Sequence, residues 1–158
     1  MLALDVVADD VAPSSVGVSL AGLPFGASDL VAWELERFQY VLGEGPGADF
    51  AGGNGGVHVD DVDATELWPQ LNEYLVGRAI AAVFSVPLTV NSHQPFGALT
   101  VYRRQTGNLT AEQRDRLRAV ANELASTVAE HVTSDVTRHD VGCGVWHMDL
   151  LNRAIGIV

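Results

Sequence analysis

Residues 79–104 read AIAAVFSVPLTV (79–90), NSHQP (91–95) and FGALTVYRR (96–104), and this stretch decides the fold. In the first run, large apolar side chains alternate with smaller, uncharged ones, which is the period of a β-strand. A strand with no charge on either face is usually covered on both sides. Residues 91–95 supply turn chemistry for a hairpin with a four- or five-residue loop. The stretch predicts a long antiparallel hairpin at the centre of a sheet, with a bulge or an unpaired position at Pro87.

Shorter patterns on either side of the hairpin predict the remaining elements. Before it we expect a helix over 3–11, a strand over 16–20, a turn with a short second strand over 21–26, a helix from residue 28 or 29 to about 41, a strand over 57–59 and a helix over 68–76. After it, Thr110 and Gln113 form a capping-box signature that opens a long helix to about residue 132. This helix carries one apolar stripe for one sheet face: Leu117, Val120, Leu124, Val128 and Val132. The order predicts an α+β fold, an antiparallel sheet with helices packed on it.

The helix expected over residues 28–41 is amphipathic. We expect its apolar side chains to make the packing contacts and its charged side chains to face water. The first set comprises Leu30, Trp33, Phe38 and Val41, and the second comprises Glu34, Glu36 and Arg37.

Composition excludes several classes of partner for this domain. The 158 residues carry a formal charge of −11, with nine arginines and no lysine, which argues against nucleic-acid binding and against anionic membrane surfaces. The N-terminal residues lack the positive flank and apolar core of a signal peptide, and no apolar run approaches the length of a membrane span. A single cysteine, Cys143, fits a reducing compartment. We therefore expect a cytoplasmic protein.

Several local motifs together are similar to those of a known family. They are Gln39 followed by LGEGPG (42–47), Asp61-Val62, Trp68-Pro69, AVFSVPL (82–88), GALTVYRR (97–104) and Leu109-Thr110. In this order and spacing they resemble the GAF domain, a small-molecule sensor module. The closest variety is the actinobacterial type that precedes an RNA-binding ANTAR domain, and RAIGIV (153–158) resembles the opening of such a domain.

The resemblance implies a fold, a division into domains and a role. The fold would be an antiparallel sheet of five or six strands, with the N- and C-terminal helices on one face and a pocket on the other. Residues 1–132 would form the GAF sensor, and residues 133–158 a linker helix and the truncated start of an ANTAR output domain. The module would be a non-enzymatic sensor in a homodimeric transcription antitermination regulator that reaches RNA only through the missing output domain. The alternative is a scaffold that binds no ligand and serves only to dimerise the output domain.

The expected pocket would be lined from the helices and strands that cover that face. The residues are Trp33, Phe38, Tyr40, Val57, Val59, Phe84 and Val86. An apolar concave site with a few polar groups suits a small molecule, although aromatic residues at such spacing equally form plain core. The ligand and any cofactor remain unnamed, because neither the cyclic-nucleotide signature nor the bilin-attaching cysteine of related GAF domains is present.

Other candidate chemistry has a functional and a structural interpretation each. The glycines of 43–47 could approach an anion or simply form a turn, and His58 could bind haem or be exposed. The acidic loop of Asp60, Asp61 and Asp63 could hold a cation or be solvated. His139, Cys143 and His147 have i, i+4, i+8 spacing, but Gly142 and Gly144 weaken the helix that would align them as metal ligands. We expect no metal and no enzyme, since no nucleophile has a recognisable base and a sulfoxide reductase of this fold would need cysteines in the sheet.

Overall fold

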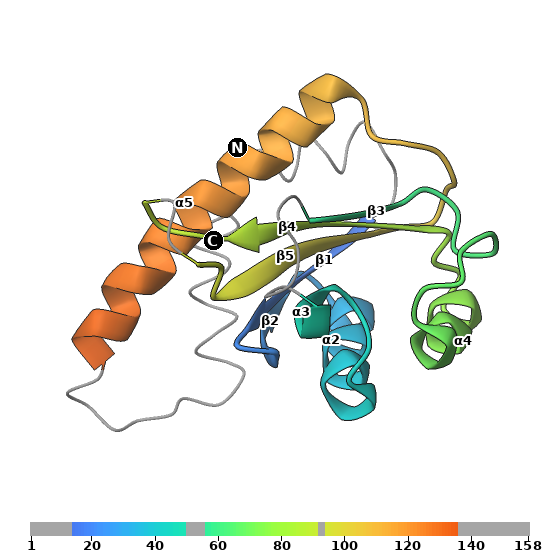
Figure 1. Ribbon diagram of the computed structural model, residues 1–158, viewed down its shortest axis with the longest axis horizontal. Helices are drawn as coiled ribbons and strands as arrows, with labels where there is room; N and C mark the ends of the chain where they lie inside the picture. The colour runs from blue at the N-terminus through green and yellow to red at the C-terminus, as the bar shows by residue number, and fades with distance from the viewer. Residues whose placement is uncertain (1–13, 50–55, 92–93, 136–158) are drawn as a thin grey trace.

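The computed structural model describes residues 14–49, 56–91 and 94–135 (Figure 1). The strands are β1 (Ser14–Leu20), β2 (Leu23–Ala27), β3 (Val57–Val59), β4 (Ala82–Leu88) and β5 (Gly97–Arg103). The helices are α2 (Leu30–Leu42), α3 (Pro46–Asp49), α4 (Pro69–Gly77) and α5 (Ala111–Asp135). The helix expected over 3–11 and the segment after α5 lie outside the described residues.

The five strands form one antiparallel sheet in the order β2-β1-β5-β4-β3, so the predicted hairpin does lie at its centre. Strands β4 and β5 pair from Ala82 opposite Arg103 to Leu88 opposite Gly97 with no shift of register. Of the two alternatives predicted at Pro87, the bulge is wrong and the unpaired position is confirmed. Pairing with β3 stops at Ser85, so Pro87 has no β3 partner and needs no backbone donor on that side. The connection spans residues 89–96 and is longer than predicted.

Helices cover both faces of the sheet, as the sequence of the hairpin predicted. In Figure 1, α5 crosses one face diagonally while α2, α3 and α4 lie against the other. The α5 side is an apolar core in which the strands contribute Val16, Val18, Phe84, Leu99 and Val101, and α5 contributes Leu117, Val120, Leu124 and Val128. The α2 side has a second apolar core that includes Leu35, Leu71, Leu75, Val83 and Tyr102. The fold is thus a three-layer α+β sandwich around one sheet.

The two faces of the sheet differ in polarity. Because side chains alternate along a strand, the neighbours of the α5-facing valines and leucines point toward α2. Along β1, β4 and β5 these neighbours are mostly polar or very small, namely Ser15, Gly17, Ser19, Ser85, Ala98 and Thr100. The serines and the threonine are nevertheless buried. A buried polar sheet face is unusual for a core, so the α2 side is the candidate location of a functional site.

Side-chain caps fix where the helices begin. Asp29 is the N-cap of α2, and its Oδ1 accepts a hydrogen bond from Ala32 N at 2.9 Å. The predicted capping box of α5 is confirmed: Gln113 N donates to Thr110 Oγ1 at 3.1 Å, and Thr110 N donates to Gln113 Oε1 at 2.9 Å. Each box member satisfies an amide that the helix leaves without a partner.

We predict that Thr110→Ala lowers the free energy of unfolding by about 1 kcal/mol, because one amide of the first turn loses its acceptor. Thr127→Ala is the matched control, since Thr127 lies mid-helix, where its hydroxyl group donates back to Glu123 O and accepts from no first-turn amide of α5. Urea unfolding measures both variants. Equal losses in the two would contradict a stabilising capping box.

Candidate ligand-sensing site between the sheet and helices α2 and α3

Helix α2 turns a carboxyl group into the interior of the protein. Its buried residues are Ala32, Leu35, Glu36 and Gln39, and Glu36 is only 1 % exposed. The prediction that Glu36 faces water is therefore wrong, and so is the packing role predicted for Leu30 and Val41, which are 69 % and 75 % exposed. The physical reason is that the i, i+3, i+4, i+7 face of α2 rests on the small residues of β1. Gly17 leaves the space, because a Cβ there would lie 2.4 Å from Glu36 Oε1.

A directional chain of hydrogen bonds runs from α3 to the Glu36 carboxyl group. Gly47 N in α3 donates to Gln39 Oε1 at 2.7 Å, and Gln39 Nε2 donates to the Tyr102 hydroxyl group. The Tyr102 hydroxyl group then donates to Glu36 Oε1 at 2.5 Å. All three side chains are buried, so the bonds lie in a medium of low polarity where each is strong. The chain connects the backbone of α3, through α2 and β5, to a single ionisable group.

The second carboxyl oxygen of Glu36, Oε2, and the hydroxyl group of Ser19 are buried beside this chain and have no partner among the described residues. The same holds for the hydroxyl group of Thr100 on this sheet face. Ser19 lies under α3, where a Cβ on Gly47 would approach its Oγ to 2.7 Å. Buried polar atoms are almost always paired with protein or water, so these atoms have hydrogen-bonding capacity left for a guest.

Burial raises the pKa of Glu36 from 4.5 to about 7, while the hydrogen bonds from Tyr102 and Gln39 oppose the rise. Burial, together with the charge of Glu36, also raises the pKa of Tyr102 well above its ordinary value, so the phenol stays protonated and remains the donor. Glu36 thus changes protonation near neutral pH, inside the protein and one bond from Tyr102. Such a displaced pKa is typical of functional sites.

The segment 43–49 forms a cover over this polar face. Gly43 ends α2 in the left-handed conformation, at φ 68°. Glu44 Oε2 accepts hydrogen bonds from Gln70 N at 2.9 Å and Leu71 N at 3.0 Å, which caps the start of α4. Asp49 Oδ2 accepts from Trp68 Nε1 at 2.7 Å. The glycine-rich segment therefore serves as a turn that ties α2 to α4 and holds α3 on the sheet.

Little space remains under this cover. A cavity of about 20 Å³ lies between α3 and strands β3, β4 and β5, bordered by Pro46, Asp49, Val57, Ser85 and Ala98. A water molecule needs a cavity of roughly 10–15 Å³ on this measure, so the space fits about one water. A larger guest would have to displace α3.

The seven residues predicted to line a pocket do not surround one cavity. Phe84 belongs to the α5-side core, and Val86 borders a separate groove against α5, because the even-numbered side chains of β4 face that helix. Tyr40 is 58 % exposed, whereas Trp33, Phe38 and Val59 pack in the α2-side core, where Phe38 stacks on Tyr74 with ring centroids 4.2 Å apart. Val57 alone borders the small cavity. A role for these residues in ligand binding stays a prediction.

The sequence does contain the signal that would have found the polar site. In SSVGVSL (14–20) and GALTVYR (97–103), the positions between the valines and leucines are serine, glycine, threonine and tyrosine. The face Ala32, Leu35, Glu36, Gln39 has helical spacing. The prediction that Glu36 faces water rested on its charge and did not take this spacing into account.

The other candidate ligands are placed as follows. Among residues 14–49, 56–91 and 94–135, no group of three or more histidine, cysteine or acidic side chains could hold a metal ion. Asp61 Oδ1 accepts from Asp63 N at 3.0 Å, a local turn contact. His58 is exposed on β3 and meets Phe84 edge-on, with ring centroids 6.0 Å apart. His139, Cys143 and His147 lie outside the described residues.

Within the same part of the chain, no helix combines the length and the apolar character needed to cross a membrane.

Comparison with solved structures agrees with this architecture. A domain of a two-component sensor histidine kinase protein from Sinorhizobium meliloti superposes with a TM-score of 0.64 at 16 % identity, over 87 % of this chain and 93 % of that one. The GAF domain region of a membrane protein from Geobacter sulfurreducens gives 0.61 at 20 %, over 80 % and 87 %. A free methionine-R-sulfoxide reductase from Thermoplasma acidophilum gives 0.51 at 15 %, over 80 % and 86 %.

These likenesses are too remote in sequence to show more than the fold. No protein-family model and no curated protein matches the sequence. The chain therefore has the fold of GAF domains, a fold used by signal sensors and by at least one reductase.

We predict that the stability difference between wild type and Glu36→Gln depends on pH. The pKa of Glu36 is higher in the folded protein than in the unfolded chain, so its contribution is fully present below pH 4.5 and is lost as pH rises to about 7. Glutamine resembles the protonated form at every pH. Relative to the variant, wild type should lose about 3 kcal/mol of unfolding free energy between pH 4.5 and pH 8.

Urea unfolding at several pH values measures this difference, and Glu66→Gln, at an exposed position, is the matched control. Its profile should run parallel to that of wild type. If the Glu36→Gln profile also runs parallel to wild type, Glu36 is not a buried carboxyl group with a raised pKa.

Proposed function

We propose that this chain is the sensor module of a transcription antitermination regulator of the GAF–ANTAR kind, and that it catalyses no reaction. Support comes from the GAF fold together with the LGEGPG, Trp68-Pro69 and GALTVYRR motifs. In such a regulator this domain would be cytoplasmic, form a homodimer and act on RNA only through an output domain beyond it. Its own charge of −11 suits a role in which it does not touch RNA.

One observation carries the proposal: the sheet face under α2 and α3 is buried yet polar, and Glu36 Oε2 and Ser19 Oγ have no partner among the described residues. Apolar side chains would stabilise this layer more, because each buried polar group loses its hydration. The retained capacity fits a small polar ligand that donates a hydrogen bond or carries a positive charge toward Glu36. The ligand itself is unidentified.

The hydrogen-bond chain supplies a route for the signal. A ligand that bonds to Glu36 or Ser19 would enter under α3 and compete with the contact between Gly47 and Gln39. Tyr102 lies on β5, and its neighbour Val101 packs in the core with α5. A change at Tyr102 is therefore one residue away from a change under α5, the helix that leads toward the output domain. The ligand shifts this equilibrium only if it binds the two arrangements of α3 with different affinity.

The absence of catalysis rests on the chemistry of the site. Reductases act on sulfoxides through reactive thiols, and residues 14–49, 56–91 and 94–135 contain no cysteine. The buried groups are a carboxyl, an amide, a phenol and a hydroxyl group, none paired with a histidine base in this part of the chain.

A second function has its own supporting observation. The cavity under α3 has a volume of only about 20 Å³, and α3 is held down by bonds from both ends of the segment 43–49. These features are also expected of a scaffold that binds no ligand and only dimerises the output domain, because such a scaffold needs no space under α3.

Thermal unfolding with a panel of amino acids, small diamines and polyols distinguishes the two functions. If the sensor function holds, at least one compound should raise the melting temperature by several degrees at 100 times its dissociation constant, equivalent to about 2.7 kcal/mol. Ser19→Val and Glu36→Gln should abolish that shift, and Glu66→Gln should retain it. No shift, together with a dimer by light scattering, would establish the scaffold instead. No shift with a monomer would contradict both.

A further inference from the structure

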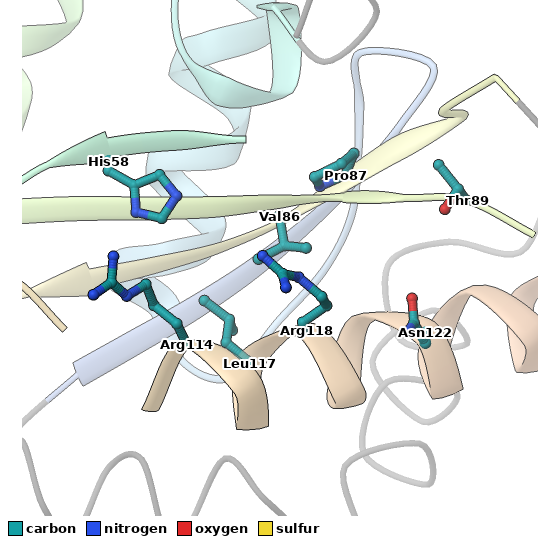
Figure 2. Close-up of a pocket in the computed structure, with 8 residues that line it drawn as sticks. All are labelled: His58, Val86, Pro87, Thr89, Arg114, Leu117, Arg118 and Asn122. Carbon is teal, nitrogen blue, oxygen red and sulfur yellow. The ribbon is translucent and has the colours of Figure 1, made fainter. Parts of the chain in front are cut away.

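A second concave site lies on the opposite side of the sheet from Glu36. It is a groove of about 240 Å³ between α5 and strands β3 and β4 (Figure 2). Leu117, Val86 and Pro87 form its apolar part, and the side chains of Arg114, Arg118 and His58 extend into it from the two sides. It shares Pro87 with the cavity under α3, and its volume is roughly ten times larger.

Helix geometry explains why the polar residues of α5 gather here. Arg114, Arg118 and Asn122 are spaced by four and so form one row along the helix. The neighbouring row, which contains Leu117, Ala121 and Leu124, is buried on the sheet. Because that row fixes the rotation of α5, the arginine row must lie along the flank that faces β4 and the edge strand β3. The capping box at Thr110 fixes the start of the helix and hence this register.

The two groove arginines differ from Arg78, Arg103 and Arg116 in that their side chains have no partner among the described residues. Arg78 pairs with Glu34 at 3.0 Å, Arg116 pairs with Glu112 at 2.5 Å, and Arg103 Nη1 donates to Gly107 O at 3.0 Å. The side chains of Arg114 and Arg118 make no hydrogen bond or ion pair within residues 14–49, 56–91 and 94–135. The chain has 20 acidic residues for nine arginines, so leaving two neighbouring arginines without a carboxylate is not forced by composition.

We propose that this groove binds a small organic anion that carries a phosphate or carboxylate group on a compact apolar body. Two guanidinium groups one helical turn apart offer paired donors for anionic oxygens, and His58 adds a donor from β3. Val86, Pro87 and Leu117 cover the apolar part of the ligand. A volume of about 240 Å³ is below that of a typical drug-sized site, so the ligand must be small.

The acidity of the whole chain does not prevent this binding. At physiological salt, charges more than about 8 Å away are largely screened, so the arginines within the groove outweigh distant carboxylates. A bound anion would join His58 on the edge strand to Arg114 and Arg118 on α5. It would therefore hold β3 against the helix, independently of what occupies the site near Glu36.

The test is a titration of the protein with phenyl phosphate, benzoate and inorganic phosphate, followed by amide chemical shifts and calorimetry. We expect phenyl phosphate or benzoate to bind and to shift the amides of residues 57–59 and 114–122. The double variant Arg114→Gln, Arg118→Gln should weaken binding at least tenfold. Arg37→Gln removes another exposed arginine, on α2, and should leave binding unchanged.

The three probes separate the possible anions. Tighter binding of phenyl phosphate than benzoate assigns a phosphate ester, and the reverse order assigns a carboxylate. Equal binding of inorganic phosphate and phenyl phosphate would contradict the role of the apolar wall. No binding at millimolar concentration, or equal weakening by Arg37→Gln, would overturn the site. Because both groove arginines are exposed, melting temperature without ligand should confirm that the double variant folds as wild type does.

Discussion

The structure depends on one hydrogen bond more than on any other, the bond from the Tyr102 hydroxyl group to Glu36. It lets a carboxyl group lie in the buried layer between the sheet and α2. Without it, the buried carboxyl group of Glu36 would lose its hydroxyl donor, and leaving a buried acceptor unsatisfied costs more than the bond itself contributes. Gly17 is required for the same reason, because any larger residue would occupy the space of the carboxyl group.

The two faces of the sheet differ, because only the α2 face accommodates the buried carboxyl group of Glu36. The α5 face is packed by branched apolar residues and fixes the position of the long helix. The α2 face combines an apolar cluster near α4 with a polar cluster under α3, where the bond between Gly47 and Gln39 holds the cover closed. A protein that only needed stability would pack both faces alike. The polar cluster is the part of the molecule to which we assign the proposed ligand site.

Much of the fold could be predicted from the sequence, because alternation, capping and turn signals are local. The hairpin, the stripe on α5 and the box at Thr110 each depend on residues within a few positions of one another. The polar site could not be predicted in the same way, since Glu36 and Tyr102 are 66 residues apart and meet only when the sheet has formed. Charge alone suggested that Glu36 is solvated, and tertiary packing decided otherwise.

The groove beside α5 could be predicted from the sequence only in part. Arg114 and Arg118 are visible in the sequence as an i, i+4 pair, but their opposite wall comes from β3 and β4, which are not adjacent to α5 in the chain. Phe84 and Val86 were predicted to line the pocket, but they lie on the α5 side of the sheet. The alternation along a strand defines two faces and does not say which helix covers each face.

The most direct test of this account is the carboxyl ¹³C titration of Glu36, followed by NMR in wild type and in Tyr102→Phe. We expect the pKa of Glu36 to be about 7 in wild type and higher in the variant, because burial raises it and the tyrosine hydrogen bond opposes the rise. A midpoint near 4.5 in wild type, or an unchanged midpoint in Tyr102→Phe, would contradict it.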